Sequence, residues 1–313
     1  MELISSKIHL DFIRWRWAAF LVSGLMIVAS AISLMLQGIN PGIDFAGGTL
    51  VQVRFVQPPQ LHEIRATMTR LGLGDVVIQE FGAREEIIIR VEKQSDDGGK
   101  SSQLAEQIVK SLEPLAGQGN VELRRVEFVG PQVGSELAEQ GALAMVYSMV
   151  AILIYVAWRF ELRFSYGAIL ALIHDTFVAV GLLSLLRIEF TLVIVAAILT
   201  LVGYSINDTI VVYDRIREEM KRRKKQELAE VINIAINQTL SRTIITSGTV
   251  LLVLVALFFF GGEVIHDFSL TLLFGIIVGT YSSIFVASPI VLLFEKKGMK
   301  GGSTSVKAKE AVS

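Results

Sequence analysis

The sequence contains no cysteine among its 313 residues, which excludes disulfides, thiolate metal ligands and cysteine nucleophiles. It also lacks the Gly-x-x-x-x-Gly-Lys-[Ser/Thr] loop of ATP-hydrolysing P-loop proteins and the Gly-x-Ser-x-Gly turn of serine hydrolases. Four histidines are present, and none of His9, His62 and His266 is placed to share a metal with His174. We therefore expect no enzyme activity, no cofactor and no bound metal.

Charged residues are also scarce, at 19% of the chain, whereas hydrophobic residues make up 52% and the mean hydropathy is +0.56. This composition predicts a membrane protein. A helix needs about 17–25 apolar residues to cross a bilayer. Six runs are long enough, at residues 17–36, 142–158, 165–186, 190–213, 243–260 and 268–294. The first run is too long for the apolar core of a signal peptide, so we interpret it as an uncleaved anchor.

Lysine and arginine collect on alternate sides of the predicted spans, and cytoplasmic loops hold this positive excess. Seven basic residues lie in the link 214–241, between the fourth and fifth spans. We therefore place this link, the N-terminal segment 1–16 and the tail 296–313 in the cytoplasm. Residues 37–137 then lie outside, and the other five spans form a bundle within residues 138–295. The basic link favours anionic lipid over nucleic acid as its partner.

Residues 48 to 128 show the pattern of a small α/β domain. Apolar and polar residues alternate over Thr49–Val56, as in a strand with one buried face. A helix with one apolar face follows, then two strands, a second helix that we expect to end at Pro114, and a last strand. The predicted fold is therefore a polytopic α-helical membrane protein with six transmembrane helices and a small extracytoplasmic ferredoxin-like α/β domain between helices 1 and 2. With no catalytic constellation, this domain is interpreted as a contact module.

A glycine-rich stretch lies between the first span and this domain. Gly42, Gly47 and Gly48 permit turns that are forbidden to other residues, and Asp44 can hydrogen-bond the loop backbone. One interpretation is a hinge that positions the domain over the membrane. The other is a plain turn between helix and strand, and the sequence leaves both open.

Two charged residues stand at similar depth in the predicted spans, Asp208 in the fourth and Arg242 at the start of the fifth. A charge inside hydrocarbon costs at least about 2.5–3.5 kcal/mol, so it tends to face a partner or a water-filled path. Asn207, Thr246 and Ser247 lie beside these charges and are candidate members of the same path. The group predicts either a site that handles protons or a static buried ion pair that fixes helix register.

His174 and Asp175 form a second polar pair, near the middle of the third span. They are candidates for an extension of the proton path, but Asp175 could instead pair with Arg242 or cap a helix of a partner subunit. In the sixth span, Gly275, Gly279 and Ser283 form a stripe of small residues, which predicts close helix packing.

Four stretches together resemble the SecF branch of the SecD/SecF family of bacterial protein-export membrane proteins: Gly42–Gly48, Ser205–Arg217, Gln238–Ser247 and Gly279–Ser283. The resemblance implies an accessory subunit of the Sec translocon that belongs to the resistance-nodulation-division superfamily and uses the proton motive force to move preproteins outward. It also implies that the aspartate and arginine of the fourth and fifth spans conduct protons.

The resemblance further implies the partners and the place of the chain. SecD would be a separate polypeptide, the SecYEG translocon would be the larger assembly together with YajC and YidC, and the location would be the bacterial inner membrane with both termini cytoplasmic. Two alternatives remain from other classes. One is half of a small-molecule or lipid exporter of the same superfamily, which predicts a far larger outer domain. The other is a non-conducting scaffold of the translocon.

Overall fold

The computed structural model describes residues 10–73, 76–91, 98–117 and 119–294, so the first residues of the expected N-terminal segment and the expected tail 296–313 lie outside the described part. The chain divides into two compact units. The first contains the residues up to Ile39, Met145–Ile188 and the residues from Val193 onward. The second contains Asn40–Ala144 and Glu189–Leu192.

Six helices in the described residues are long and apolar enough to cross a membrane, which confirms the predicted class. They are α1 (Arg16–Gln37), α5 (Pro131–Arg159), α6 (Leu162–Leu185), α7 (Leu192–Arg222), α8 (Leu228–Phe260) and α9 (Glu263–Ser282). A 3-10 helical turn at Ile13–Trp15 precedes α1, and a π-helical turn at Ser283–Ala287 continues α9.

Several helices extend beyond the apolar runs that predicted them. Only residues 223–227 separate α7 from α8, so the link expected over 214–241 is largely helical. The extensions are held by packing, because Ile216 of α7 and Ile232 of α8 are fully buried in one apolar cluster. A search for long apolar runs misses such amphipathic helix ends, since polar residues interrupt them.

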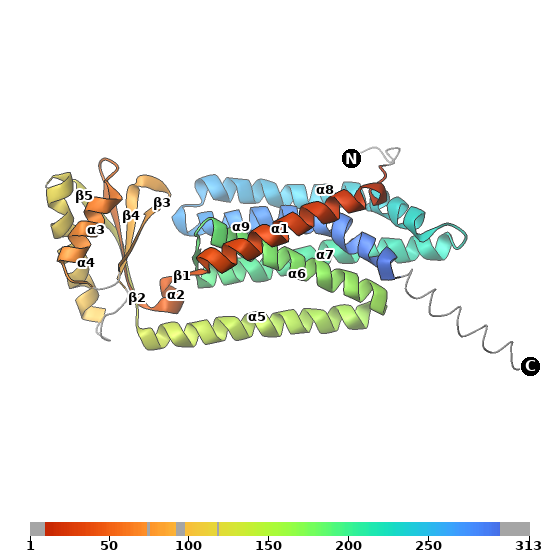
Figure 1. The fold of residues 1–313 in the computed structure, drawn as a ribbon, viewed down its shortest axis with the longest axis horizontal. Helices are drawn as coiled ribbons and strands as arrows, with labels where there is room; N and C mark the ends of the chain where they lie inside the picture. Colours follow the sequence, from red (N-terminus) through yellow and green to blue (C-terminus); the bar gives the residue numbers. More distant parts are fainter. Residues whose placement is uncertain (1–9, 74–75, 92–97, 118, 295–313) are drawn as a thin grey trace, which may run out of the picture. The chain divides into compact units, whose positions relative to one another are not determined.

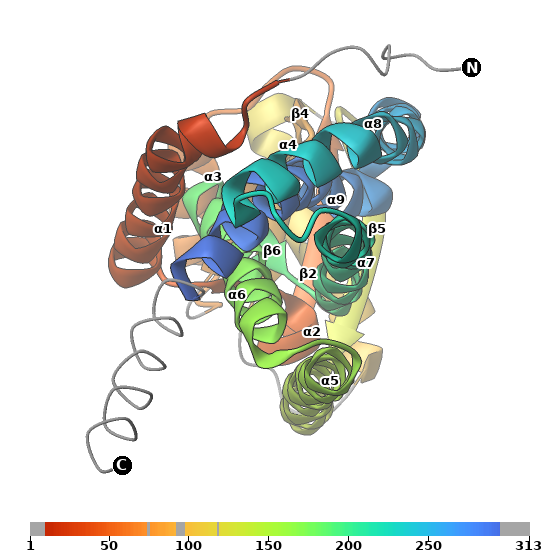
Figure 2. The ribbon, with the colours of Figure 1, turned by 90° about the vertical axis from the view of Figure 1, so that its right-hand side faces the viewer.

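Within the helical unit, α6, α7 and α9 are the most buried helices, and α1, α5 and α8 expose many apolar side chains. Figure 2 looks along these helices and shows α1 at one edge of the group. Small residues let α1 approach α6 closely: a Cβ atom on Gly181 would lie 2.1 Å from the Oγ atom of Ser30. The Ser33 hydroxyl also donates to Ser184 at 2.9 Å. Apolar surfaces on the outer helices are suited to lipid or to a partner helix.

The second unit contains the α/β domain. Its elements are β2 (Gly48–Phe55), α3 (Leu61–Arg70), β3 (Val76–Phe81), β4 (Ala83–Val91), α4 (Gly98–Ala116) and β5 (Val121–Val129). The four strands form an antiparallel sheet in the order β3-β4-β2-β5. Both helices lie on the same face of this sheet (Figure 1), and buried residues such as Val53, Ile64 and Ile108 fill the space between. The predicted ferredoxin-like unit is thus confirmed.

We expected the second helix of the α/β domain to end at Pro114. In the structure this helix, α4, continues to Ala116. A proline cannot donate the backbone N–H that would bond to the carbonyl four residues earlier. Pro114 lies in the last turn of the helix, so only a few residues after it depend on continued helical geometry. Gly117 ends the helix instead: its φ of 88° is in the left-handed region, and its N–H donates to the carbonyl of Glu113 at 2.8 Å.

A second, two-stranded sheet belongs to the same unit. Strand β1 (Asn40–Pro41) pairs in parallel with β6 (Glu189–Phe190), and the short helix α2 (Ile43–Ala46) follows β1. Arg90 of β4 donates to the carbonyl oxygen of Pro41 and pairs with Glu189 at 3.7 Å. The sheet of the α/β domain is therefore tied to the residues that lead directly into α7.

Candidate functional site

Asp208 lies on α7 with 6% of its surface exposed, at a point where three membrane helices meet. Its Oδ1 atom accepts a hydrogen bond from the Thr243 hydroxyl of α8 at 2.9 Å. Its Oδ2 atom accepts one from the hydroxyl of Ser283, which begins the π-helical turn after α9, at 2.6 Å. The carboxylate is thus held by hydroxyl groups from two neighbouring segments.

Arg242 does not form the direct ion pair that the sequence left open as an alternative. Within the described residues, Arg242 is exposed and acts on Asp208 only as a nearby charge, beyond the 4 Å of a salt bridge. The reason is its place on α8, where Thr243 is the residue that faces Asp208. The hydroxyl of Thr246 bonds to the carbonyls of Arg242 and Thr243 in its own helix, at 2.9 and 3.1 Å. The hydroxyl of Ser247 instead forms a hydrogen bond with the hydroxyl of Thr280 on the neighbouring helix α9, at 2.9 Å.

Asp175 forms a second buried carboxylate site, with 1% of its surface exposed on α6. Its Oδ1 atom lies 2.9 Å from Nδ1 of His174. Its Oδ2 atom accepts hydrogen bonds from Ser205 of α7 at 2.5 Å and from Ser282 of α9 at 2.6 Å. The sequence identified the His174 and Asp175 pair but not the two serines, although Ser205 lies one helical turn before Asp208. Asp175 does not pair with Arg242.

The small residues of α9 face α7. A Cβ atom on Gly275 would lie 2.6 Å from Leu201, and one on Gly279 would lie 3.1 Å from Ser205. Glycine at these positions lets the two helices approach closely. The third member of the stripe, Ser283, serves a different purpose, because its hydroxyl binds Asp208. Close packing of α9 on α7 thus brings serine hydroxyls within reach of both buried carboxylates.

A polar face on α7 and α8 is exposed in the isolated chain. Its members are small or polar residues at helical spacing on two membrane helices: Thr200, Gly203 and Asn207 on α7, and Arg242, Thr246 and Thr249 on α8. A side chain at Gly203 or at Gly248 would have nothing within 4 Å. Polar groups at this depth are costly against lipid, so this face is suited to a partner helix or to water.

The glycine-rich stretch fits tightly into the second unit. The Asp44 Oδ2 atom accepts the backbone N–H of Leu192, the first residue of α7, at 2.9 Å. A Cβ atom on Gly42 would lie 2.7 Å from the side chain of Thr191, and one on Gly47 would lie 3.1 Å from the backbone of Pro131. Gly47 and Gly48 also have positive φ angles, of 69° and 114°, which favour glycine.

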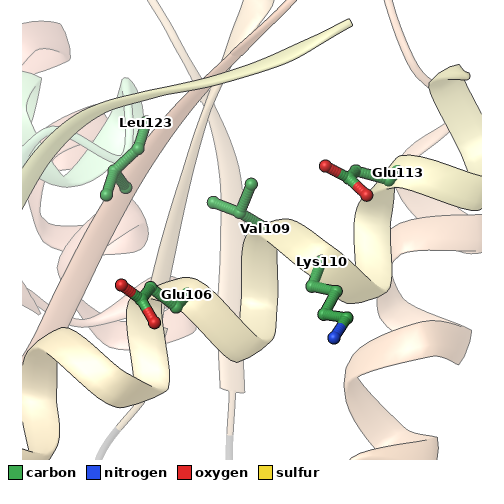
Figure 3. Close-up of a pocket in the computed structure, with 5 residues that line it drawn as sticks. All are labelled: Glu106, Val109, Lys110, Glu113 and Leu123. Atoms are coloured by element: carbon green, nitrogen blue, oxygen red, sulfur yellow. The ribbon is translucent and has the colours of Figure 1, made fainter. Parts of the chain in front are cut away.

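The α/β domain has a hollow of about 300 Å³ on its surface, between α4 and β5, shown in Figure 3. Glu106, Val109, Lys110 and Glu113 of α4 line it, and Leu123 of β5 faces them. No reactive group gathers there among the described residues, and nowhere in that part of the chain do three histidine or acidic side chains converge as metal ligands. Among the described residues, the ionisable groups that are buried between membrane helices include Asp175 and Asp208, with His174 beside Asp175.

Six membrane helices with ionisable groups buried between them, joined to a ferredoxin-like unit, define an integral membrane protein of the transporter type. The chain belongs to the SecD/SecF family of protein-export membrane proteins. Residues 108–297 match the family described as "Protein export membrane protein SecD/SecF, C-terminal", and residues 32–59 match the "SecD/SecF GG Motif".

The relatives carry the same description. The protein translocase subunit SecF of Magnetococcus marinus is 59% identical over 295 residues, which are 94% of this chain and 95% of the relative. The SecF subunit of Vibrio alginolyticus is 47% identical over 291 residues, 93% of this chain and 91% of its own. These relatives confirm the predicted family and favour protein export over the export of small molecules or lipids.

Solved structures of SecDF share the fold. The crystal structure of SecDF, a translocon-associated membrane protein from Thermus thermophilus, is 35% identical and superimposes with a TM-score of 0.84. A second structure, of SecDF in a super-membrane-facing form, gives a TM-score of 0.70. The superposition with the first SecDF structure includes 94% of this chain but only 40% of the SecDF chain. This chain therefore corresponds to one part of that longer protein.

Proposed function

We propose that this chain promotes the export of preproteins across the bacterial inner membrane, together with SecD as a separate polypeptide, and that the proton motive force acts through Asp208. The supporting observation is that Asp208 is buried and held by hydroxyls. A hydroxyl group both donates and accepts hydrogen bonds, so Thr243 and Ser283 can bind an ionised or a protonated carboxyl group. A buried carboxylate without a directly paired cation is costly to keep ionised, which favours binding of a proton.

The exposed polar face of α7 and α8 is our proposed docking site for SecD. A helix of SecD would cover Asn207, Arg242 and Thr246 and complete the proton path beside Asp208. Ser247 would belong to the same path through its bond to Thr280 of α9. The correspondence of this chain to one part of a SecDF chain supports the assignment of SecD as the missing part.

The larger assembly and the orientation are also proposals. SecYEG, with YajC and YidC, would supply the channel and the preproteins, and both termini of this chain would lie in the cytoplasm. The orientation is supported by the basic residues near the end of α7, since cytoplasmic loops hold positive charge. Part of this charge is paired inside the helix, where buried Glu219 binds Arg223 at 2.7 Å. Anionic lipid would take the remaining cations.

Gly42, Asp44, Gly47 and Gly48 would fix the outer domain to the start of α7. The hydrogen bond from Leu192 to Asp44 supports this role, as does the lack of space for side chains at Gly42 and Gly47. In this arrangement the stretch itself is a rigid joint, and bending would take place elsewhere in the chain.

The test compares export of a secreted protein in cells that carry the wild-type chain, the Asp208→Asn variant or no chain. The matched control is Asp214→Asn, on the same helix, where the carboxylate is partly exposed and pairs with Arg159 at 2.8 Å. Membrane levels and capture of SecD are measured for each variant. We expect Asp208→Asn to lower the export rate to that of cells without the chain, and Asp214→Asn to leave it near the wild-type rate.

The scaffold alternative makes the opposite prediction. If Asp208→Asn assembles normally with SecD and exports at the wild-type rate, Asp208 serves packing only, and the proton-driven function is wrong.

A further inference from the structure

Asp175 has the surroundings of an ionisable group that does more than hold helices together. Its two oxygens receive bonds from three helices: from His174 on its own helix α6, from Ser205 on α7 and from Ser282 on α9. The only charged or titratable side chain that contacts it within the described residues is His174. Helix α1, which also packs on α6, carries no charged residue after Arg16. No arginine or lysine therefore fixes Asp175 in its ionised form.

Two consecutive serines connect this carboxylate to Asp208. Ser282 donates to Asp175 and Ser283 donates to Asp208, both at 2.6 Å. They stand where α9 changes into the π-helical turn, a feature that often marks functional sites in helices. The turn is held from α7 by the buried Tyr213 hydroxyl, which donates to the carbonyl of Ala287 at 2.9 Å.

Each serine hydroxyl has a second acceptor within reach. Ser282 lies 3.1 Å from the carbonyl oxygen of Gly279, and Ser283 lies 3.0 Å from that of Thr280. A hydroxyl carries one proton, so it donates either to its carboxylate or to its own helix. The Gly279 carbonyl also accepts the backbone N–H of Ser283, and its two lone pairs can hold this N–H and the Ser282 hydroxyl together.

We propose that Asp175 is a second proton-binding carboxylate, and that Ser282 and Ser283 couple its protonation to that of Asp208. The proposal rests on the proton-driven function proposed above for Asp208. An aqueous proton binds Oδ2 of Asp175, and the new O–H group donates to the Ser282 oxygen. The hydrogen of Ser282 then turns to the Gly279 carbonyl, which also accepts the N–H of Ser283, so the change at Ser282 reaches the residue that donates to Asp208. Release of the proton reverses each of these steps, and no other bond forms or breaks.

Electrostatic repulsion couples the two carboxylates as well. Two carboxylates buried near each other in a medium of low dielectric constant disfavour simultaneous ionisation, so a proton on one favours ionisation of the other. Groups that interact in this way titrate as a pair, and a change to either one alters the whole titration. On the α8 side, Thr243 contacts Asp208 and Arg242 acts on it only as a nearby charge.

The experiment is infrared difference spectroscopy of the carboxyl band as a function of pH. The full chain, with isotope-labelled aspartate, is reconstituted in vesicles with unlabelled SecD, so that the shifted bands come from this chain alone. The variants are Asp175→Asn, Asp208→Asn and Ser282→Ala. The matched control is Ser269→Ala, on the same helix, which removes a buried hydroxyl without a hydrogen-bond partner.

We expect two coupled transitions in the wild type. Asp175→Asn should abolish one and shift the midpoint of the other by about one pH unit, the size at which sites titrate as a pair. Ser282→Ala should shift both midpoints, and Ser269→Ala should shift neither. The proposal is wrong if Asp208 titrates and Asp175→Asn leaves the spectrum unchanged, or if Ser282→Ala behaves like the control. If the Asp208 band itself does not titrate, the proposed function fails instead.

Discussion

Replacement of Asp44 by alanine tests the contact between the glycine-rich stretch and the first residue of α7. The Asp44 carboxylate accepts the backbone N–H of Leu192, at the end of the helix where backbone donors have no partner of their own. Loss of such a cap costs about 0.5–2 kcal/mol. Opening of the first turn of α7 should therefore become roughly 2 to 30 times more frequent, because each 1.4 kcal/mol is about a factor of ten in an equilibrium.

Hydrogen–deuterium exchange of the peptide that contains Leu192 measures this opening directly. We expect Asp44→Ala to speed exchange there by that factor, and Asp44→Asn to restore most of the protection, because asparagine caps helices as well as aspartate does. Asp11→Ala is the matched control, since Asp11 accepts the N–H of Arg14 at 3.1 Å at a different helical turn. Equal exchange in Asp44→Ala and wild type would show that the carboxylate does not hold α7, and the reasoning would be refuted.

Two further substitutions test the packing. Gly167→Ala should destabilise the helical unit by about 1–3 kcal/mol in thermal unfolding, because the new Cβ atom would lie 2.3 Å from the Tyr213 hydroxyl. The control is Gly24→Ala, which should be neutral because a Cβ atom there would have nothing within 4 Å. Ile108→Ala should cost about 2–5 kcal/mol in the fully buried core of the α/β domain, and a denaturant midpoint equal to that of the wild type would contradict this.

The fold could largely be predicted from the sequence, because its signals are local. Apolar runs long enough to span a bilayer stand out individually, and the alternation over Thr49–Val56 marks a strand without knowledge of its neighbours. The helical extensions around residues 223–227 were missed because they depend on packing between α7 and α8. The end of α4 was misplaced because Gly117, and not Pro114, terminates the helix.

The charged residues of the candidate site could be predicted from the sequence, but the hydroxyl groups that bind them could not. A charged residue in an apolar run is conspicuous, so Asp208, Arg242 and Asp175 could be identified directly. Their partners are serine and threonine, which are common in membrane helices and acquire meaning only when the helices are placed together. The resemblance singles out the stretch that contains Ser282, but no local pattern shows that its hydroxyl binds a carboxylate, whereas that of Ser269 has no hydrogen-bond partner in the structure.

The energy available from protons bears on the number of carboxylates that an export cycle needs. One elementary charge that crosses 100 mV releases about 2.3 kcal/mol. Reversal of a two-state equilibrium from 1:99 to 99:1 requires about 5.5 kcal/mol. On the proposed function, a single proton carried by Asp208 would supply less than half of a full switch at that potential, whereas two protons carried in one cycle, one by each carboxylate in turn, would supply about 4.6 kcal/mol. A second proton site at Asp175, coupled to Asp208 through adjacent serines, would bring the driving force to the scale that a complete conformational change demands.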